Sequence, residues 1–212
     1  MSDSVRWPLF LAASAVLILT PGPAVLYIVA RSVSQGRAAG LVSALGVGAG
    51  NLVHAVAAAL GLSAILASSA AAFAAVKYLG AAYLVYLGAR KFLTAPTETP
   101  GMRCAPQTLA AVFRQGLLVG TFNPKTALFF LAFLPQFAVA GHGPVWGQLL
   151  LFGIVFVALA VISDSAYALL GGAFGGWLKR RRAFARGERY VSGAVYCGLG
   201  VVAALSGRPA NH

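Results

Sequence analysis

The sequence contains few charged residues and very few acidic ones. Of its 212 residues, 9% are charged and only 4 are Asp or Glu, whereas 59% are hydrophobic. A soluble domain carries about 25% charged residues, so this chain lacks the surface that a water-soluble fold needs. Residues 38–76 contain no charged residue at all. Because a membrane-spanning helix needs roughly 20 apolar residues, the sequence predicts an all-α integral membrane protein.

Residues that support catalysis or hold a cofactor are missing as well. The sequence has no Ser-His-Asp set, no His/Cys ligand cluster and no phosphate-binding glycine loop. Its two cysteines, Cys104 and Cys197, have neither pairing nor metal-ligand spacing. We therefore expect no enzyme, no cofactor and no metal site. A membrane redox protein that uses Cys197 is a competing hypothesis.

The net charge of +12 does not indicate a nucleic-acid partner. The arginines and lysines occur in short clusters between apolar runs, without interleaved aromatic residues and without a known nucleic-acid motif. This distribution is typical of the cytoplasmic loops of membrane proteins.

Six apolar runs are separated by polar or helix-breaking residues. Each run is long enough, or nearly long enough, to cross a membrane as a helix. The predicted spans are 7–30, 39–66, 70–89, 109–138, 145–173 and 190–206.

Most basic residues lie in or next to alternate connections between these spans, although Lys77 and Arg208 do not. These connections are the ones between the first and second, the third and fourth, and the fifth and sixth, where residues 179–189 read KRRRAFARGER. The other two connections, ILASSAAAF and AVAGHGPVWG, contain no Lys or Arg. This asymmetry predicts three cytoplasmic basic loops and both termini outside the cytoplasm. The run 179–189 either only sets this topology or also binds anionic membrane lipid.

The two halves of the chain resemble each other. PGPAVLYIVA at residues 21–30 aligns with NPKTALFFLA at 123–132, and KYLGAAYLVYLG at 77–88 aligns with RYVSGAVYCGLG at 189–200. Between them, the Pro-rich segment 94–107 is typical of a linker.

We therefore predict two homologous three-helix halves within a single membrane domain, 1–212. Residues 1–93 form the first repeat, 94–108 a cytoplasmic linker and 109–212 the second repeat. Because three is an odd number of spans, the second half enters the membrane from the opposite side. Such an inverted repeat is common among secondary transporters.

Matched prolines interrupt the first and the fourth span. Pro21 and Pro23 lie inside the first run, and Asn123-Pro124-Lys125 occupies the corresponding place in the fourth. Proline removes a backbone donor and clashes with the preceding turn. In a membrane, the carbonyls that it frees are tolerated only against protein or a water-lined cavity. The sequence predicts helix breaks in both spans, although a proline in a spanning helix can also be a simple kink.

A solute site is predicted where the two helices restart. In inverted halves, both restarted helices direct their positive N-terminal ends toward the middle of the membrane, where Lys125 also lies. Two such ends and a cation suit a carboxylate. The predicted substrate-binding residues are Thr20, Pro21, Gly22, Pro23, Asn123, Pro124 and Lys125.

Asp164 is the only acidic residue within a predicted span. An unpaired carboxylate there costs at least ~2.5 kcal/mol, so it needs a partner or water. It is a counter-ion for Lys125, a proton carrier, or a residue near the cytoplasmic interface. His54 and Asn51 lie one turn apart in the second span and are either packing residues or part of the proton or ion coupling site.

Two glycines in the second span predict a close contact between helices. Gly46 and Gly50 have the spacing of a GxxxG motif. Small residues at this spacing let two helix backbones approach each other.

Three blocks of the sequence carry a resemblance to a known family. They are LTPGPAVLYIVARSVSQGRAAGLVSALGVGAGNLVHA at 19–55, KYLGAAYLVYLGAR at 77–90 and FNPKTALFFLAFLPQF at 122–137. In this order and spacing, the sequence resembles the LysE/RhtB family of bacterial amino-acid exporters over nearly its whole length.

The resemblance implies six spans in the bacterial inner membrane and efflux of an amino acid or a related metabolite in exchange for protons. It places the TPGP motif at residues 20–23 and the NPK motif at residues 123–125. Ala24 departs from the pattern, because many members have asparagine there. This departure leaves the substrate class open.

We therefore expect a secondary transporter that exports a small carboxylate-bearing solute by alternating access. The solute's carboxylate lies near Pro23 and Lys125, and Asp164 or His54 handles a proton. The alternative is a passive channel or an ion-handling membrane protein of related architecture. Six short spans make a thin bundle, so a homodimer is a further hypothesis.

Overall fold

The structure is a computed structural model. It describes residues 3–62, 70–93, 107–139 and 141–178, and single helical positions at 190, 194, 197, 198, 201, 204 and 205. Cys104, linker residues 94–106 and the basic run 179–189 lie outside the described residues. The described part is helical and contains no strands. Its α-helices are α1 (Asp3–Leu19), α2 (Pro23–Gln35), α3 (Arg37–Ala57), α5 (Ala70–Leu93), α6 (Leu109–Thr121), α7 (Pro124–Leu128) and α8 (Val145–Leu178).

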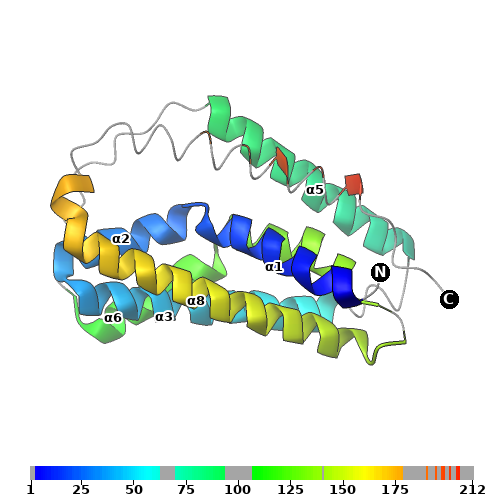
Figure 1. Ribbon diagram of the computed structural model, residues 1–212, viewed down its shortest axis with the longest axis horizontal. Coiled ribbons are helices and arrows are strands. Elements are labelled where there is room, and N and C mark those ends of the chain that lie inside the picture. The colour runs from blue at the N-terminus through cyan, green and yellow to red at the C-terminus, as the bar shows by residue number, and fades with distance from the viewer. Residues whose placement is uncertain are drawn as a thin grey trace.

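The helices form an elongated bundle (Figure 1). Helices α1 and α2 follow each other along it, and α8 runs beside them for most of its length. Helix α3 packs mainly against α6 and α8, while α5 lies on the other side of the bundle and contacts the chain after the second break. The starts of α1 and α8 lie at one end of the bundle, and the end of α2 and the start of α6 lie at the other.

Both predicted helix breaks are confirmed. Helix α1 ends at Leu19 and α2 begins at Pro23, with a bend of 51° between them. Helix α6 ends at Thr121, α7 begins at Pro124, and the bend there is 41°. In each case a proline occupies the start of the new helix, where its missing N–H costs nothing.

The chain after the second break does not continue as a regular α-helix, which the sequence did not predict. Helix α7 passes into a π-helix, Phe129–Phe133, and then into a 3-10 helix, Leu134–Phe137. The Leu134 amide bonds to the Phe129 carbonyl five residues back, and Pro135 has no amide with which to resume α-helical pairing. A second π-helix, Ala58–Leu62, extends α3.

The burial pattern is that of a protein surrounded by lipid. Large apolar side chains such as Leu19, Leu60 and Ile162 are exposed, whereas several polar and charged side chains are buried. Polar residues that face the interior are the rule for membrane helices. Among the described residues, Arg37–Gly61, Val145–Gly171 and the two bent helix pairs are long and apolar enough to cross a membrane. The chain is a multi-pass membrane protein.

The six-span prediction goes further than these four segments. Helix α5 covers the third predicted span but is not among them, and the sixth falls on residues that are described only at single positions. Six spans and the inverted repeat therefore stay predictions.

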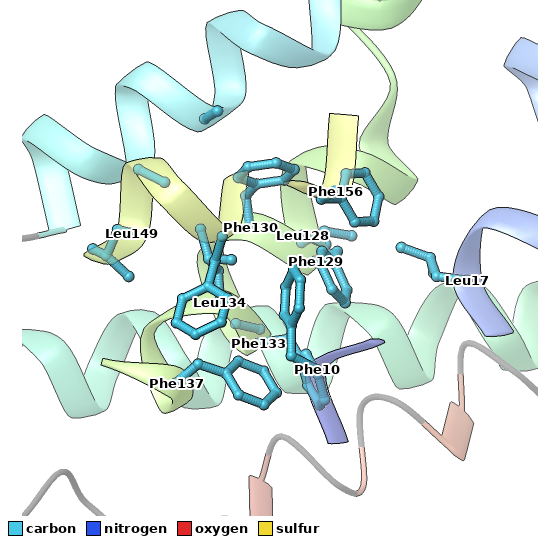
Figure 2. Close-up of a cluster of buried hydrophobic side chains, with 14 of the residues drawn as sticks. Phe10, Leu17, Leu128, Phe129, Phe130, Phe133, Leu134, Phe137, Leu149 and Phe156 are labelled. Carbon is cyan, nitrogen blue, oxygen red and sulfur yellow. The ribbon is translucent and has the colours of Figure 1, made fainter. Parts of the chain in front are cut away.

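A cluster of phenylalanines holds the second restarted helix in place (Figure 2). Phe129 stacks on Phe156 of α8 with 4.8 Å between ring centroids. Phe137 meets Phe10 of α1 edge to face at 5.3 Å. Such aromatic pairs stabilise beyond the area that they bury. The π and 3-10 segments are thus clamped between α1 and α8.

The predicted contact at Gly46 and Gly50 is confirmed. These glycines of α3 meet Gly116 and Gly120 of α6, which have the same spacing and were missed as partners. A Cβ on Gly50 would lie 2.6 Å from the Thr121 amide nitrogen and 2.8 Å from Gly120 Cα. Because the obstacles are backbone atoms, side-chain rotation cannot relieve them.

We predict that Gly50→Ala destabilises the protein, because α3 and α6 would have to separate. Overpacking of this kind costs about 1–3 kcal/mol, which is read as a lower melting temperature of the purified protein in detergent. The control is Gly147→Ala, where the added Cβ meets only Pro144 Cγ at 3.5 Å. Equal melting temperatures for the two variants would contradict the close contact.

Candidate functional site: a cavity between the two helix breaks

A small cavity lies where both restarted helices begin. Its volume is about 30 Å³, which is room for roughly two water molecules. The first turns of α2 and α7 contribute to its wall, together with one face each of α3 and α8. The lining residues are Leu17, Ile18, Gly22, Ala24, Val25, Val47, Asn51, Asn123, Lys125, Thr126, Phe156, Ala160 and Asp164.

The carbonyls freed at the first break find donors within the bundle. Pro21 and Pro23 cannot pair with Leu17 and Leu19, the residues four positions earlier. The Thr20 amide donates to the Leu17 carbonyl at 3.2 Å instead. The Tyr167 hydroxyl, from α8, donates to the Leu19 carbonyl at 2.9 Å. The break is therefore stabilised by tertiary contacts.

The second break is stabilised in the same way. Pro124 leaves the Gly120 carbonyl without its helical donor. The Asn123 amide donates to this carbonyl at 3.1 Å, and His54 Nε2, from α3, lies 3.3 Å from it. The Asn123 side chain accepts from the Lys125 amide at 3.2 Å and caps α7. The contact of His54 favours the packing role over the coupling role for this residue.

Lys125 joins the two breaks. Its ammonium group donates to the carbonyl of Thr20, at the end of the first break. The side chain is only 7% exposed and lines the same cavity as Asp164, with which it interacts electrostatically. Asp164 is 6% exposed. The two buried charges of opposite sign thus face one small space, where their interaction is stronger than it would be in water.

The structure brings together five of the residues that the sequence selected. Gly22, Asn51, Asn123, Lys125 and Asp164 all line the cavity. This list combines both breaks with the two unbroken helices α3 and α8. That these residues bind a solute or couple ions stays a prediction.

The other selected residues do not line the cavity. Pro23 and Pro124 are exposed and act by ending the preceding helix. The Thr20 hydroxyl donates to the Val16 carbonyl at 2.6 Å, and only its own carbonyl reaches Lys125. Pro21 and His54 also lie outside the lining.

Some lining residues were not predicted from the sequence, although their helical spacing from a predicted site residue indicates them. Phe156 and Ala160 precede Asp164 at intervals of four on α8, and Val47 precedes Asn51 by four on α3. Residues at this spacing share a helix face. Counting back from the polar residue would have found them.

A buried arginine lies at each end of the bent pair α1 and α2. Arg31, near the end of α2, donates to the side-chain oxygens of Gln107 at 2.8 Å and Gln115 at 2.6 Å. Arg6, near the start of α1, donates to the Gln148 side chain at 3.1 Å and to the Phe137 carbonyl at 3.3 Å. Both arginines thus tie the bent pair to the second half of the chain.

A sequence model of the LysE type translocator family matches residues 15–207. The chain belongs to this family. The resemblance seen in the sequence is thereby confirmed. No solved structure matches the chain.

Relatives of this LysE-type chain include both unassigned proteins and named exporters. An uncharacterized membrane protein of Pseudomonas aeruginosa is 33% identical over 87% of this chain and 88% of its own length. The leucine efflux protein of Salmonella typhimurium is 33% identical over 78% of each chain. The homoserine/homoserine lactone efflux protein of the same organism is 28% identical over 82% of this chain and 84% of its own.

We predict that the charges of Lys125 and Asp164 depend on each other. Lys125→Met should lower the free energy of unfolding by roughly 1–3 kcal/mol, because it removes the donor to Thr20 and the cation near Asp164. Adding Asp164→Asn should restore part of the loss, since a neutral amide needs no cation. The measurement is a double-mutant cycle on melting in detergent, with an expected coupling of about 0.5–3 kcal/mol. Additive effects would show that the two charges do not interact.

Proposed function

We propose that this LysE-type protein is a secondary transporter that exports an amino acid. One observation carries the proposal. The restarted helices α2 and α7 both begin at the same cavity, and its lining includes one cationic side chain, Lys125, and one anionic side chain, Asp164. Broken helices at a midplane site are a recurrent feature of such transporters. The efflux functions named for two relatives support the same reading.

The site suits the carboxylate of the solute. Gly22 caps α2 without a side chain, so the amides of the first turn of α2 have no side-chain acceptor. Such a helix end attracts negative charge. Lys125 adds a full positive charge at the same cavity. Together they form an anion site in a medium of low dielectric constant, where such interactions are strong.

Asp164 is proposed to couple export to protons. It faces the cavity beside Lys125 and can alternate between binding a proton and acting as the counter-ion of the lysine. Binding of a proton and binding of the solute would then compete at the charged pair Lys125 and Asp164. This competition is the simplest basis for an exchange of solute against protons.

Alternating access is proposed to use the breaks as hinges and the two arginines as closures. A cavity of about 30 Å³ is too small for an amino acid, so it must open for binding. Arg6 holds one end of the bent pair and Arg31 the other. Their partners include the neutral side chains of Gln148, Gln107 and Gln115. Breaking one cluster at a time would open the site to one side.

We propose the six-span inverted repeat as the frame of this movement, with halves 1–93 and 109–212. The two breaks at aligned positions, bent by 51° and 41°, support it. So does the Cys197 thiol, which donates to the Val85 carbonyl at 3.7 Å. These two residues occupy equivalent positions in the aligned halves, as expected near a two-fold axis. In this frame the Arg31 end faces the cytoplasm of a bacterium and both termini lie outside.

Export should depend on the proton gradient and on both charged residues. In proteoliposomes loaded with L-leucine, an imposed pH gradient should drive its movement, and an uncoupler should abolish the accumulation. Lys125→Met should lose transport, whereas Asp164→Asn should lose the response to the gradient and retain exchange of labelled for unlabelled leucine only at a reduced affinity. Gradient-independent flux in the unaltered protein would refute antiport, and absence of exchange would favour the channel alternative.

The two arginine clusters should control access from opposite sides. A Thr126→Cys reporter in the cavity wall, in a chain without its two native cysteines, is labelled with a membrane-impermeant thiol reagent from either face. Arg31→Met should increase labelling from the cytoplasmic face several-fold, and Arg6→Met from the outer face. The reporter chain alone is the control. Increased labelling from the same face in both variants would contradict the assignment of the closures.

A further inference from the structure

Asn51 has a buried oxygen without a partner. Its side chain is 3% exposed and lines the cavity from α3, and its Oδ1 has no hydrogen-bond partner among the described residues. Buried polar atoms in native proteins are nearly always satisfied, so an exception needs an explanation. The side chain lines the cavity, so rotation of its terminal amide brings the oxygen within reach of a donor in the cavity without a change of α3. Asn51 therefore points to a ligand or a water that carries a donor.

The polar groups of the cavity include acceptors on the unbroken helices and donors on the restarted helices, beside the Asn51 amide nitrogen and the side chains of Asn123 and Thr126. The acceptors, Asn51 Oδ1 and the Asp164 carboxylate, come from the unbroken helices α3 and α8. The donors, Lys125 and the first-turn amides of α2, come from the restarted helices. A solute that presents a cationic nitrogen and a carboxylate on neighbouring atoms matches both sets at once.

The net charge of the cavity lining restricts the net charge of the solute. Lys125 and Asp164 are its only ionisable residues, so their formal charges sum to zero. A zwitterion adds no net charge to this site, whereas a solute with a further charged group brings one that no residue of the lining balances. Burying an unbalanced charge is costly.

The rest of the lining is mainly apolar. Leu17, Ile18, Val47, Phe156 and Ala160 form most of its remaining surface. Such side chains favour an apolar group on the solute and offer little to a polar one.

We propose that Asn51 Oδ1 and the Asp164 carboxylate bind the α-ammonium group of a neutral amino acid whose side chain is apolar. The inference rests on the proposed function and adds the substrate class and the role of Asn51 as an acceptor. When the cavity opens, α3 and α8 present both acceptors, and closure of the restarted helices brings their donors to the carboxylate.

The test is ligand binding to the purified full-length protein in detergent, which does not depend on proton coupling. The probes are L-leucine, the 2-hydroxy acid of the same carbon skeleton, L-lysine and L-glutamate, and the readout is the concentration that gives half-maximal thermal stabilisation. Leucine should bind at least about tenfold more tightly than each of the other three, since hydrogen bonds to a charged group are among the strong ones.

Variants of Asn51 separate the acceptor role from a packing role. Asn51→Leu should weaken leucine binding at least about tenfold and leave the hydroxy acid unchanged, so the ratio of the two affinities falls. Asn51→Gln keeps an amide oxygen near this position without adding a charge and should retain more of the leucine affinity than Asn51→Leu. The control is Ser43→Ala on the same helix, whose hydroxyl donates to the Ala39 carbonyl at 2.8 Å and lies outside the cavity.

Each contrary result has a defined meaning. Equal affinity of the unaltered protein for leucine and the hydroxy acid would overturn the ammonium site. Lysine or glutamate binding as tightly as leucine would overturn the neutral class. An unchanged affinity ratio in Asn51→Leu would overturn the role of Asn51. Leucine binding without gradient-driven export would refute the proposed antiport and leave this inference intact.

Discussion

Inside a lipid bilayer, a backbone carbonyl that loses its helical partner must find another donor within the protein. This constraint governs the arrangement around both proline breaks. The Tyr167 hydroxyl donates a hydrogen bond to the Leu19 carbonyl, and His54 contacts the Gly120 carbonyl. Each broken span is therefore supported by a neighbouring unbroken helix. The Lys125 ammonium group donates to the Thr20 carbonyl and thereby links one break to the other. The two breaks thus take donors from different helices, and Lys125 connects them.

The glycine contact sets the positions from which these donors act. Gly46 and Gly50 bring α3 against α6, and this close approach lets His54 reach Gly120. It also fixes the rotation of α3, so that Asn51 faces the cavity on another side of the helix. The phenylalanine cluster packs the π and 3-10 segments against α1 and α8 (Figure 2). Packing between helices thus determines which polar groups share the central space.

The features that make the breaks tolerable also give the cavity its chemistry. A restarted helix supplies amide donors, a lysine that satisfies a carbonyl also supplies a cation, and the aspartate that accompanies the lysine supplies an anion. A transporter site therefore needs few residues beyond those that the fold already requires. Arg6 and Arg31 connect the two ends of the bent pair to the second half of the chain.

The sequence by itself determined that this is a helical membrane protein, where the helices before Pro23 and before Pro124 end, and which family it resembles. These properties depend on hydropathy, on prolines and on contiguous motifs, which are local and survive in a linear pattern. It also marked Asn51, Lys125 and Asp164, because polar residues are conspicuous in apolar runs. Only the tertiary structure decided that these three share a cavity while His54 supports a break, because helix rotation and packing across distant segments are not encoded by spacing alone. Likewise, the π and 3-10 winding after α7 and the pairing of Gly46 with Gly116 depend on which neighbour each residue meets.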